Sequence, residues 1–197
     1  MHDFDITAAL RTAFILAHVL AFTVAASAVA FGDFAIFGRR RVDLALLSKA
    51  TQIVTFALIA LWITGLAVIW LDTRFALAAM MSNQKLLAKL TVVTLLTLNG
   101  IALHRLAFPR FRLPQRDPGR AALLSSVLGA ISGATWLFAA FIGVGRAVAP
   151  ALGYSGFMAL YAAVVVGGIG FGVRFVRPRL VPRLNRPGVR GRASASS

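Results

Sequence analysis

Five apolar stretches, each long enough to cross a lipid bilayer, dominate the sequence. They occur at about 10–37, 52–71, 86–107, 123–146 and 151–173. A helix needs roughly 20 apolar residues to span about 30 Å of hydrocarbon, and each stretch meets that length. Only 14% of the residues are charged, far fewer than the surface of a soluble domain of this size carries. The pattern therefore predicts an all-α polytopic membrane helical bundle with five transmembrane helices.

The first apolar stretch is predicted to be a retained helix rather than a cleaved signal peptide. Small residues at 26–28 resemble a cleavage site, but Asp3 and Asp5 precede the stretch, where a secretory signal carries positive charge. The apolar character also continues through residues 31–37.

Lysines and arginines cluster in alternate connections between the five stretches, which predicts the orientation of the chain. The basic connections are the first (Arg39, Arg40, Arg41, Lys49), the third (Arg105, Arg110, Arg112, Arg116, Arg120) and the C-terminal tail. Short loops rich in Lys and Arg stay in the cytoplasm. With an odd number of spans, the N-terminus is then expected outside and the C-terminus in the cytoplasm.

The C-terminal tail, residues 177–197, is predicted to be separate from the helical bundle of residues 1–176. Prolines and glycines interrupt its arginines, so we expect it to be disordered or to lie on anionic lipid headgroups. The formal net charge is +15, but the basic residues lie between apolar runs. This arrangement favours a lipid partner and argues against nucleic acid.

Glycines punctuate the fourth and fifth stretches. Gly129 and Gly133 form a GxxxG pattern, and Gly168, Gly170 and Gly172 follow in the fifth. Small residues let helix backbones approach closely, which suits packing within the bundle, a homo-oligomer or a membrane partner.

Ionisable residues inside the apolar stretches are the best candidates for function, because each costs about 2.5–3.5 kcal/mol at the centre of a membrane helix. Four qualify: His18 and Asp33 in the first stretch, and Lys89 and His104 in the third. Within each pair the separation is 15 residues. That is about 22 Å along a helix and about 60° around it, so each helix presents both groups on one stripe.

Two polar layers follow if the first and third helices are parallel neighbours. His18 would then be level with Lys89 in the outer half, and Asp33 with His104 near the cytoplasmic face. The second layer is a structural carboxylate–imidazole pair that neutralises a costly Asp. Arg11 lies on the His18 stripe, further out. Two plainer interpretations stay open: Lys89 reaches the headgroups with its long side chain, and His18 bonds a neighbouring carbonyl.

A haem with His18 as axial ligand and Lys89 beside it fits this arrangement. His18 and His104 are not expected to ligate one iron together, because they differ by roughly 10–20 Å in depth. The haem propionates are expected to face Arg11, Arg74 or Lys85 at the outer surface.

Residues 83–90, followed by Leu98-Asn99-Gly100 and His104, resemble the third helix of copper-resistance D-like and HemJ-type membrane proteins. The resemblance covers roughly residues 10–110 and includes His18 and Lys89. It implies a small polytopic protein of the bacterial cytoplasmic (inner) membrane that binds haem b or a porphyrin, either as an electron carrier or as a protoporphyrinogen oxidase. Where the HemJ group continues its first helix with a Trp and an Arg, this chain has Ala25 and Ala26. The resemblance thus extends to the scaffold more than to the oxidase activity.

Two other functions stay open. Copper handling on the outer face would use the soft or imidazole ligands Met1, His2, Met80 and Met81. A non-enzymatic membrane subunit would use the polar residues for helix packing alone. Cysteine is absent, which excludes disulfides, iron–sulfur clusters and thiol catalysis.

Overall fold

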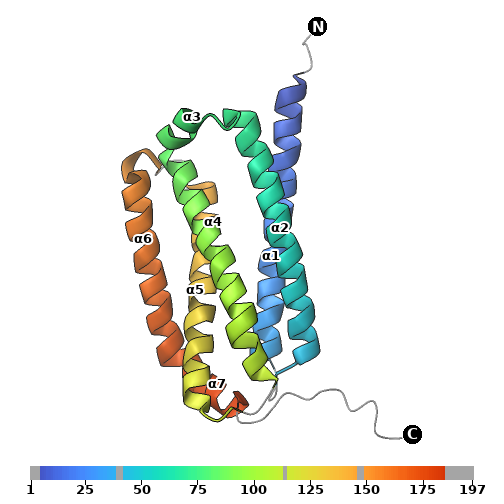
Figure 1. The fold of residues 1–197 in the computed structure, drawn as a ribbon, viewed down its shortest axis with the longest axis vertical. Coiled ribbons are helices and arrows are strands. Elements are labelled where there is room, and N and C mark those ends of the chain that lie inside the picture. The colour runs from blue at the N-terminus through green and yellow to red at the C-terminus, as the bar shows by residue number, and fades with distance from the viewer. Residues whose placement is uncertain (1–4, 39–41, 113–114, 146–148, 185–197) are drawn as a thin grey trace, which may run out of the picture. The chain divides into compact units, whose positions relative to one another are not determined.

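The structure, a computed structural model, describes residues 5–38, 42–112, 115–145 and 149–184 (Figure 1). All regular elements in these residues are helices. Five of the described segments are long and apolar enough to cross a membrane: Ile6–Phe37, Leu44–Thr73, Gln84–Phe111, Pro118–Val144 and Pro150–Leu184. The prediction of an all-α, five-span membrane protein is confirmed, and the chain is a multi-pass integral membrane protein.

The helices extend beyond the apolar stretches because polar residues can continue a helix outside the hydrocarbon. The long helices are α1 (Ile6–Phe37), α2 (Leu44–Thr73), α4 (Gln84–Ala102), α5 (Pro118–Val144) and α6 (Ala149–Phe171). The short elements are α3 (Leu77–Ser82), the π-helix η1 (Leu103–Ala107), the 3-10 helix η2 (Phe108–Phe111), the π-helix η3 (Gly172–Val176) and α7 (Arg177–Leu184).

Polar side chains fix where three of the long helices begin. The Asp5 carboxylate accepts hydrogen bonds from the backbone N–H groups of residues 7 and 8 at the start of α1. Asn83 caps α4 in the same way, and Asp117 caps α5 just before Pro118. Each cap satisfies N–H groups that have no partner within the helix, and is worth about 1 kcal/mol.

The chain divides into two compact units, which are described separately. The N-terminal unit comprises residues 1–38 and 45–82, and therefore α1, nearly all of α2, and α3. The C-terminal unit comprises residues 39–44 and 83–197, with α4 to α7.

In the N-terminal unit, α1 and α2 pair as antiparallel helices along a seam of mostly small residues (Figure 1). Along α1 the seam positions recur every seven residues: Arg11, His18, Ala25 and Gly32. Along α2 the same interval separates Ala50, Ala57 and Thr64. A seven-residue repeat is typical of helices that coil around each other, and small side chains let the backbones approach closely.

Three contacts fix the alignment of this seam. Arg11 bonds Asp72, His18 bonds Thr64, and a Cβ built on Gly32 would lie 3.8 Å from the Cβ of Ala50. From one contact to the next, the residue number rises along α1 by about as much as it falls along α2, as expected for an antiparallel pair. Ala25, Ala28 and Ala35 are buried along the seam.

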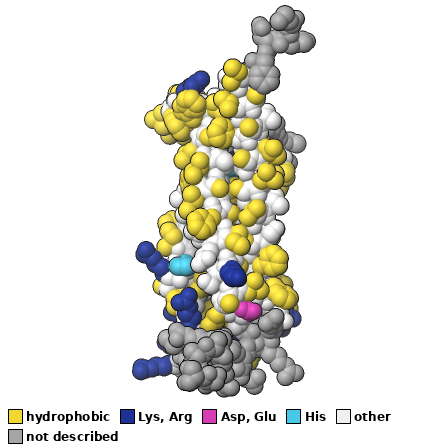
Figure 2. All heavy atoms as spheres, turned by 90° about the vertical axis from the view of Figure 1, so that its right-hand side faces the viewer, with side chains coloured by type: hydrophobic (Ala, Val, Ile, Leu, Met, Phe, Trp, Pro, Cys, Tyr) yellow, Lys and Arg dark blue, Asp and Glu magenta, His cyan; other side chains and the backbone are white. Residues whose placement is uncertain are grey.

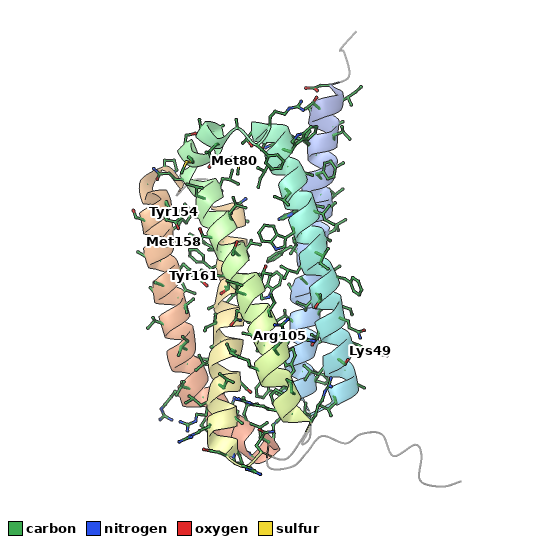
Figure 3. The ribbon with its side chains drawn as sticks, in the orientation of Figure 1. Lys49, Met80, Arg105, Tyr154, Met158 and Tyr161 are labelled. Atoms are coloured by element: carbon green, nitrogen blue, oxygen red, sulfur yellow. The ribbon has the colours of Figure 1, made fainter. Side chains whose placement is uncertain are left out.

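In the C-terminal unit, α4, α5 and α6 each contact the other two. Their core is a cluster of buried apolar residues: Ala88, Val92, Phe138, Ile142 and Phe157. Tyr154, Met158 and Tyr161 lie on the side of α6 that faces α4 and α5 (Figure 3). The Tyr154 hydroxyl is 3.3 Å from that of Thr91, and the Tyr161 hydroxyl is 3.0 Å from that of the fully buried Thr135.

The glycines divide into two groups by what surrounds them. Cβ atoms built on Gly168 and Gly172 would lie 3.3 and 3.0 Å from alanine side chains of α5, so these glycines let α6 and η3 pack closely on α5. Around Gly129 and Gly133 no described atom outside their own helix lies within 4 Å of such a Cβ. The GxxxG pattern thus makes no close contact within the described residues, and an oligomer or partner through it stays a prediction.

The start of the basic tail is helical, and the expectation that the tail is disordered or lies on anionic headgroups stays a prediction. Residues 177–184 form α7, and Leu180 and Leu184 are buried where α7 packs against α5. α7 continues directly from the π-helix η3, and Pro178 and Pro182 both lie within this helical run. Two leucines four residues apart then give the short helix one apolar face. Residues 185–197 lie outside the described residues.

On the face drawn in Figure 2, hydrophobic side chains cover the middle, and most Lys and Arg side chains lie towards one end. This distribution is typical of a protein that crosses a membrane. Arg39, Arg40 and Arg41 lie outside the described residues, and the predicted orientation of the termini stays a prediction.

Candidate functional site

His18 lies half-buried on α1, with its ring against α2. Its Nδ1 is 2.9 Å from the hydroxyl oxygen of Thr64. The Thr64 hydroxyl already donates its single proton to the carbonyl of Ala60, at 2.7 Å. The hydroxyl therefore accepts from His18, and Nδ1 carries the proton. In the neutral ring the lone pair is then on Nε2.

The neighbouring glycine makes room for the imidazole. A Cβ built on Gly65 would lie 3.4 Å from the Cε1 of His18, which is the near limit of an ordinary contact. Thr64 and Gly65 thus act together, one as hydrogen-bond acceptor and the other as the surface on which the ring packs. The sequence singled out His18, but not its bond to Thr64.

Arg11 and Asp72 form a second polar contact between α1 and α2. The Nε and Nη2 of Arg11 donate to the two carboxylate oxygens of Asp72, at 2.7 and 3.3 Å. Both side chains are partly exposed, at 43% and 40%. Arg11 was predicted to face haem propionates, and its partner in the described residues is a carboxylate of the protein. The two contacts are seven residues apart on α1 (Arg11 to His18) and eight apart on α2 (Thr64 to Asp72). These nearly equal separations are the sequence signal for the pairing.

The two predicted lysines lie one turn apart at the start of α4. Lys85 is half-buried and Lys89 is exposed. Both belong to the C-terminal unit, whereas His18 belongs to the N-terminal unit. The layer of His18 with Lys89 stays a prediction.

The predicted pair of Asp33 and His104 is likewise divided between the units. Asp33 is exposed near the end of α1, and His104 is exposed in η1. The His104 ring meets Phe108 edge-on, with 6.3 Å between ring centroids. This pair, too, stays a prediction.

The copper site predicted at Met1, His2, Met80 and Met81 stays a prediction. No group of three or more His, Asp or Glu residues suited to a metal occurs in the part of the chain that the structure describes. Met80 is half-buried and Met81 is exposed, next to each other on α3 (Met80 in Figure 3). Met1 and His2 lie outside the described residues.

Asn99, another polar residue of the third span, has a structural role. Its side-chain amide donates to the carbonyl of Leu128, at 3.1 Å, and so links α4 to α5. It is buried, and a buried amide that finds a backbone carbonyl stabilises helix packing.

Comparisons with protein-family models, with curated proteins and with solved structures give no match to this chain.

Proposed function

We propose that this membrane protein binds haem b or a related porphyrin, with His18 as the axial ligand. The observation that carries the proposal is the hydrogen bond between His18 Nδ1 and the Thr64 hydroxyl. Histidines that ligate iron or another metal nearly always donate their second ring N–H to a protein acceptor, which fixes the tautomer and the ring orientation. Thr64 supplies such an acceptor.

The donor set around His18 fits a haem ligand. Because the Thr64 hydroxyl donates its hydrogen bond to the Ala60 carbonyl, it accepts from Nδ1 and leaves Nε2 with the lone pair that an iron ligand needs. Thr64 is buried, so the hydrogen bond is shielded from water.

Arg11 is the cationic side chain of the N-terminal unit that is proposed to face the propionates. The guanidinium has five N–H donors, and the bonds to Asp72 use two of its nitrogens. Its remaining donors can therefore bind a carboxylate while Asp72 holds it in place.

When bound, haem supplies one-electron redox chemistry. The chain contributes a fixed imidazole, a hydrogen bond that raises the basicity of that imidazole, and apolar helices that exclude water. These features suit electron transfer, and the same site would suit porphyrinogen oxidation.

A second candidate is a non-enzymatic membrane subunit in which the polar residues only pair helices. The observation in its favour is that Arg11 and His18 both lie on the seven-residue seam of α1, where each bonds a side chain of α2. In that case the His18–Thr64 bond contributes to the stability of the helix pair, and His18 does not bind haem.

Absorption spectroscopy of the detergent-solubilised protein, before and after haem is supplied, tests the proposal. We expect a Soret band in the wild type, its loss in His18→Ala and its retention in His104→Ala, which removes an exposed histidine of the other unit. Thr64→Val should keep the band and change the reduction potential. A folded wild type without Soret absorbance at saturating haem would exclude haem binding and leave the subunit interpretation.

A further inference from the structure

Two segments of the C-terminal unit, residues 84–111 and 153–180, share a pattern when the numbering is shifted by 69 positions. The π-helices coincide under this shift, Leu103–Ala107 with Gly172–Val176. So do the segments that follow: Arg105, Pro109 and Arg110 correspond to Arg174, Pro178 and Arg179. We call residues 105–111 and 174–180 the two arginine arms.

The two arms also match in exposure. Leu106 is 49% exposed and its counterpart Phe175 is 50% exposed, whereas Phe111 is 4% exposed and its counterpart Leu180 is 3% exposed. Each arm therefore buries its last residue and turns an apolar side chain outward beside an exposed arginine. The first arm packs against α5 through η1, and the second through η3 and α7.

The arms end at the same depth because α4 and α6 start level and run in parallel. The side-chain oxygen of Gln84 accepts the backbone N–H of Tyr154, at 3.0 Å. From this bond, α4 extends over residues 84–102 and α6 over residues 153–171 before each π-helix begins. At 1.5 Å per residue, Arg105 and Arg174 each lie about 30 Å further along, which is the thickness of the hydrocarbon layer.

Charge at this end of the unit is almost entirely positive. From residue 83 onward the sequence has one acidic residue, Asp117, and its carboxylate pairs with Arg120 at 3.2 Å. Arg105, Arg174 and Arg179 are exposed, and Arg110 is partly exposed (Arg105 in Figure 3). Outward apolar side chains next to arginines at a membrane boundary can insert among acyl chains while the guanidinium groups bind phosphates.

We propose that the two arginine arms form a binding surface for the phosphate headgroups of anionic phospholipids. In each arm the two arginines hold the phosphate, Leu106 or Phe175 enters the acyl region, and the arm ends in a buried apolar residue, Phe111 or Leu180. This surface is part of the folded unit and is distinct from residues 185–197. It also lies outside the haem site proposed above, so the two proposals stand or fall separately.

Binding of fluorescent phosphatidylglycerol to the full-length protein in phosphatidylcholine nanodiscs tests this surface. The variant Arg105→Gln, Arg110→Gln, Arg174→Gln, Arg179→Gln removes the arm charges. Each arginine near an anionic surface contributes about fivefold in affinity, so we expect binding at least about tenfold weaker. The matched control, with glutamine at Arg112, Arg116, Arg120 and Arg183, loses equal charge at the same end and should weaken binding clearly less than the arm variant does.

Two further measurements complete the test. The variant with lysine at the four arm positions keeps the charge and should retain most of the binding, and circular dichroism verifies that each variant keeps its helices. Equal weakening in the arm variant and the control would overturn the proposal, as would unchanged binding in the arm variant. Competition by inorganic phosphate at the affinity of the lipid would also overturn it, because the partner would then be free phosphate.

Discussion

The guanidinium of Arg11 and the carboxylate of Asp72 form two hydrogen bonds between α1 and the last turn of α2, at 2.7 and 3.3 Å. Two helical turns further along α1, His18 forms a hydrogen bond with Thr64. The two helices, which carry mostly small residues between them, are therefore aligned by polar side chains. This alignment gives His18 its position, whichever function it serves.

Breaking the ion pair should destabilise the helix pair modestly. Both side chains are more than a third exposed, so Asp72→Asn or Arg11→Gln should lower the free energy of unfolding by about 0.2–1 kcal/mol. Unfolding in mixed micelles with increasing denaturing detergent measures the loss. The exchanged variant, Arg11→Asp with Asp72→Arg, should recover part of it. Additive losses in the double neutral variant would show that the pair has no coupling energy.

Replacing Thr64 with valine should lower the free energy of unfolding, because it removes a hydrogen bond between α1 and α2. The substitution keeps the shape and removes the acceptor of the His18 Nδ1 proton, and a net hydrogen bond of this kind is worth about 1 kcal/mol. Thr64→Ser is the matched control, because it keeps the hydroxyl. The cost of Thr64→Val should largely vanish when His18 is already alanine. An equal cost in both backgrounds would mean that the bond to His18 is not the cause.

The five spans were predictable because length and hydropathy alone decide whether a segment can cross a bilayer. Helix ends were less so, since caps such as Asp5 and Asn83 act outside the apolar stretches. Composition did not show that residues 177–184 form a helix, whereas the spacing of Leu180 and Leu184 favours it. Local helix rules therefore describe the ends of the described helices better than composition does.

The candidate site was predictable in part. His18 stands out because an imidazole inside an apolar helix needs a partner. Its bond to Thr64 depends on the alignment of α1 with α2, which hydropathy does not contain. The seven-residue recurrence of Arg11, His18, Ala25 and Gly32 carries that information, but only once α2 is known to be the facing helix. Pairings between the first and third spans stay predictions.

Gly153→Ala should destabilise the start of α6. Gly153 has φ +58° and ψ −173°, a conformation that glycine alone adopts readily, and an added Cβ would lie 2.6 Å from the side-chain oxygen of Gln84. We expect a loss of about 1–3 kcal/mol in the free energy of unfolding. Gly143→Ala is the control: it lies in α5, no described atom outside its own helix lies within 4 Å of an added Cβ, and the change should be neutral or slightly stabilising.

The variant that combines Gly153→Ala with Gln84→Ala separates the two causes. Removing the Gln84 side chain relieves the close contact but leaves the unfavourable backbone angle. A full recovery of stability would mean that the contact with Gln84, rather than the positive φ, makes glycine necessary.

Gly172→Leu should separate η3 from α5, whereas Gly170→Leu should be tolerated. A Cβ on Gly172 would lie 3.0 Å from the Cβ of Ala130 and 3.1 Å from the carbonyl oxygen of Ser126, and these belong to a packed helix that cannot retreat without cost. Overpacking of this kind typically costs about 1–3 kcal/mol. Gly170 is exposed and has no such neighbour within 4 Å.

Both variants add the same side chain to the same span, so their difference isolates the packing of η3 on α5. Thermal unfolding in detergent should show a lower midpoint for Gly172→Leu and an unchanged or higher midpoint for Gly170→Leu, since leucine favours the helix over glycine by about 1 kcal/mol. Because the second arginine arm is anchored through this contact, Gly172→Leu should also weaken binding of phosphatidylglycerol, while Gly170→Leu leaves it unchanged. Equal midpoints for the two variants would show that the close approach at Gly172 does not hold the segment in place.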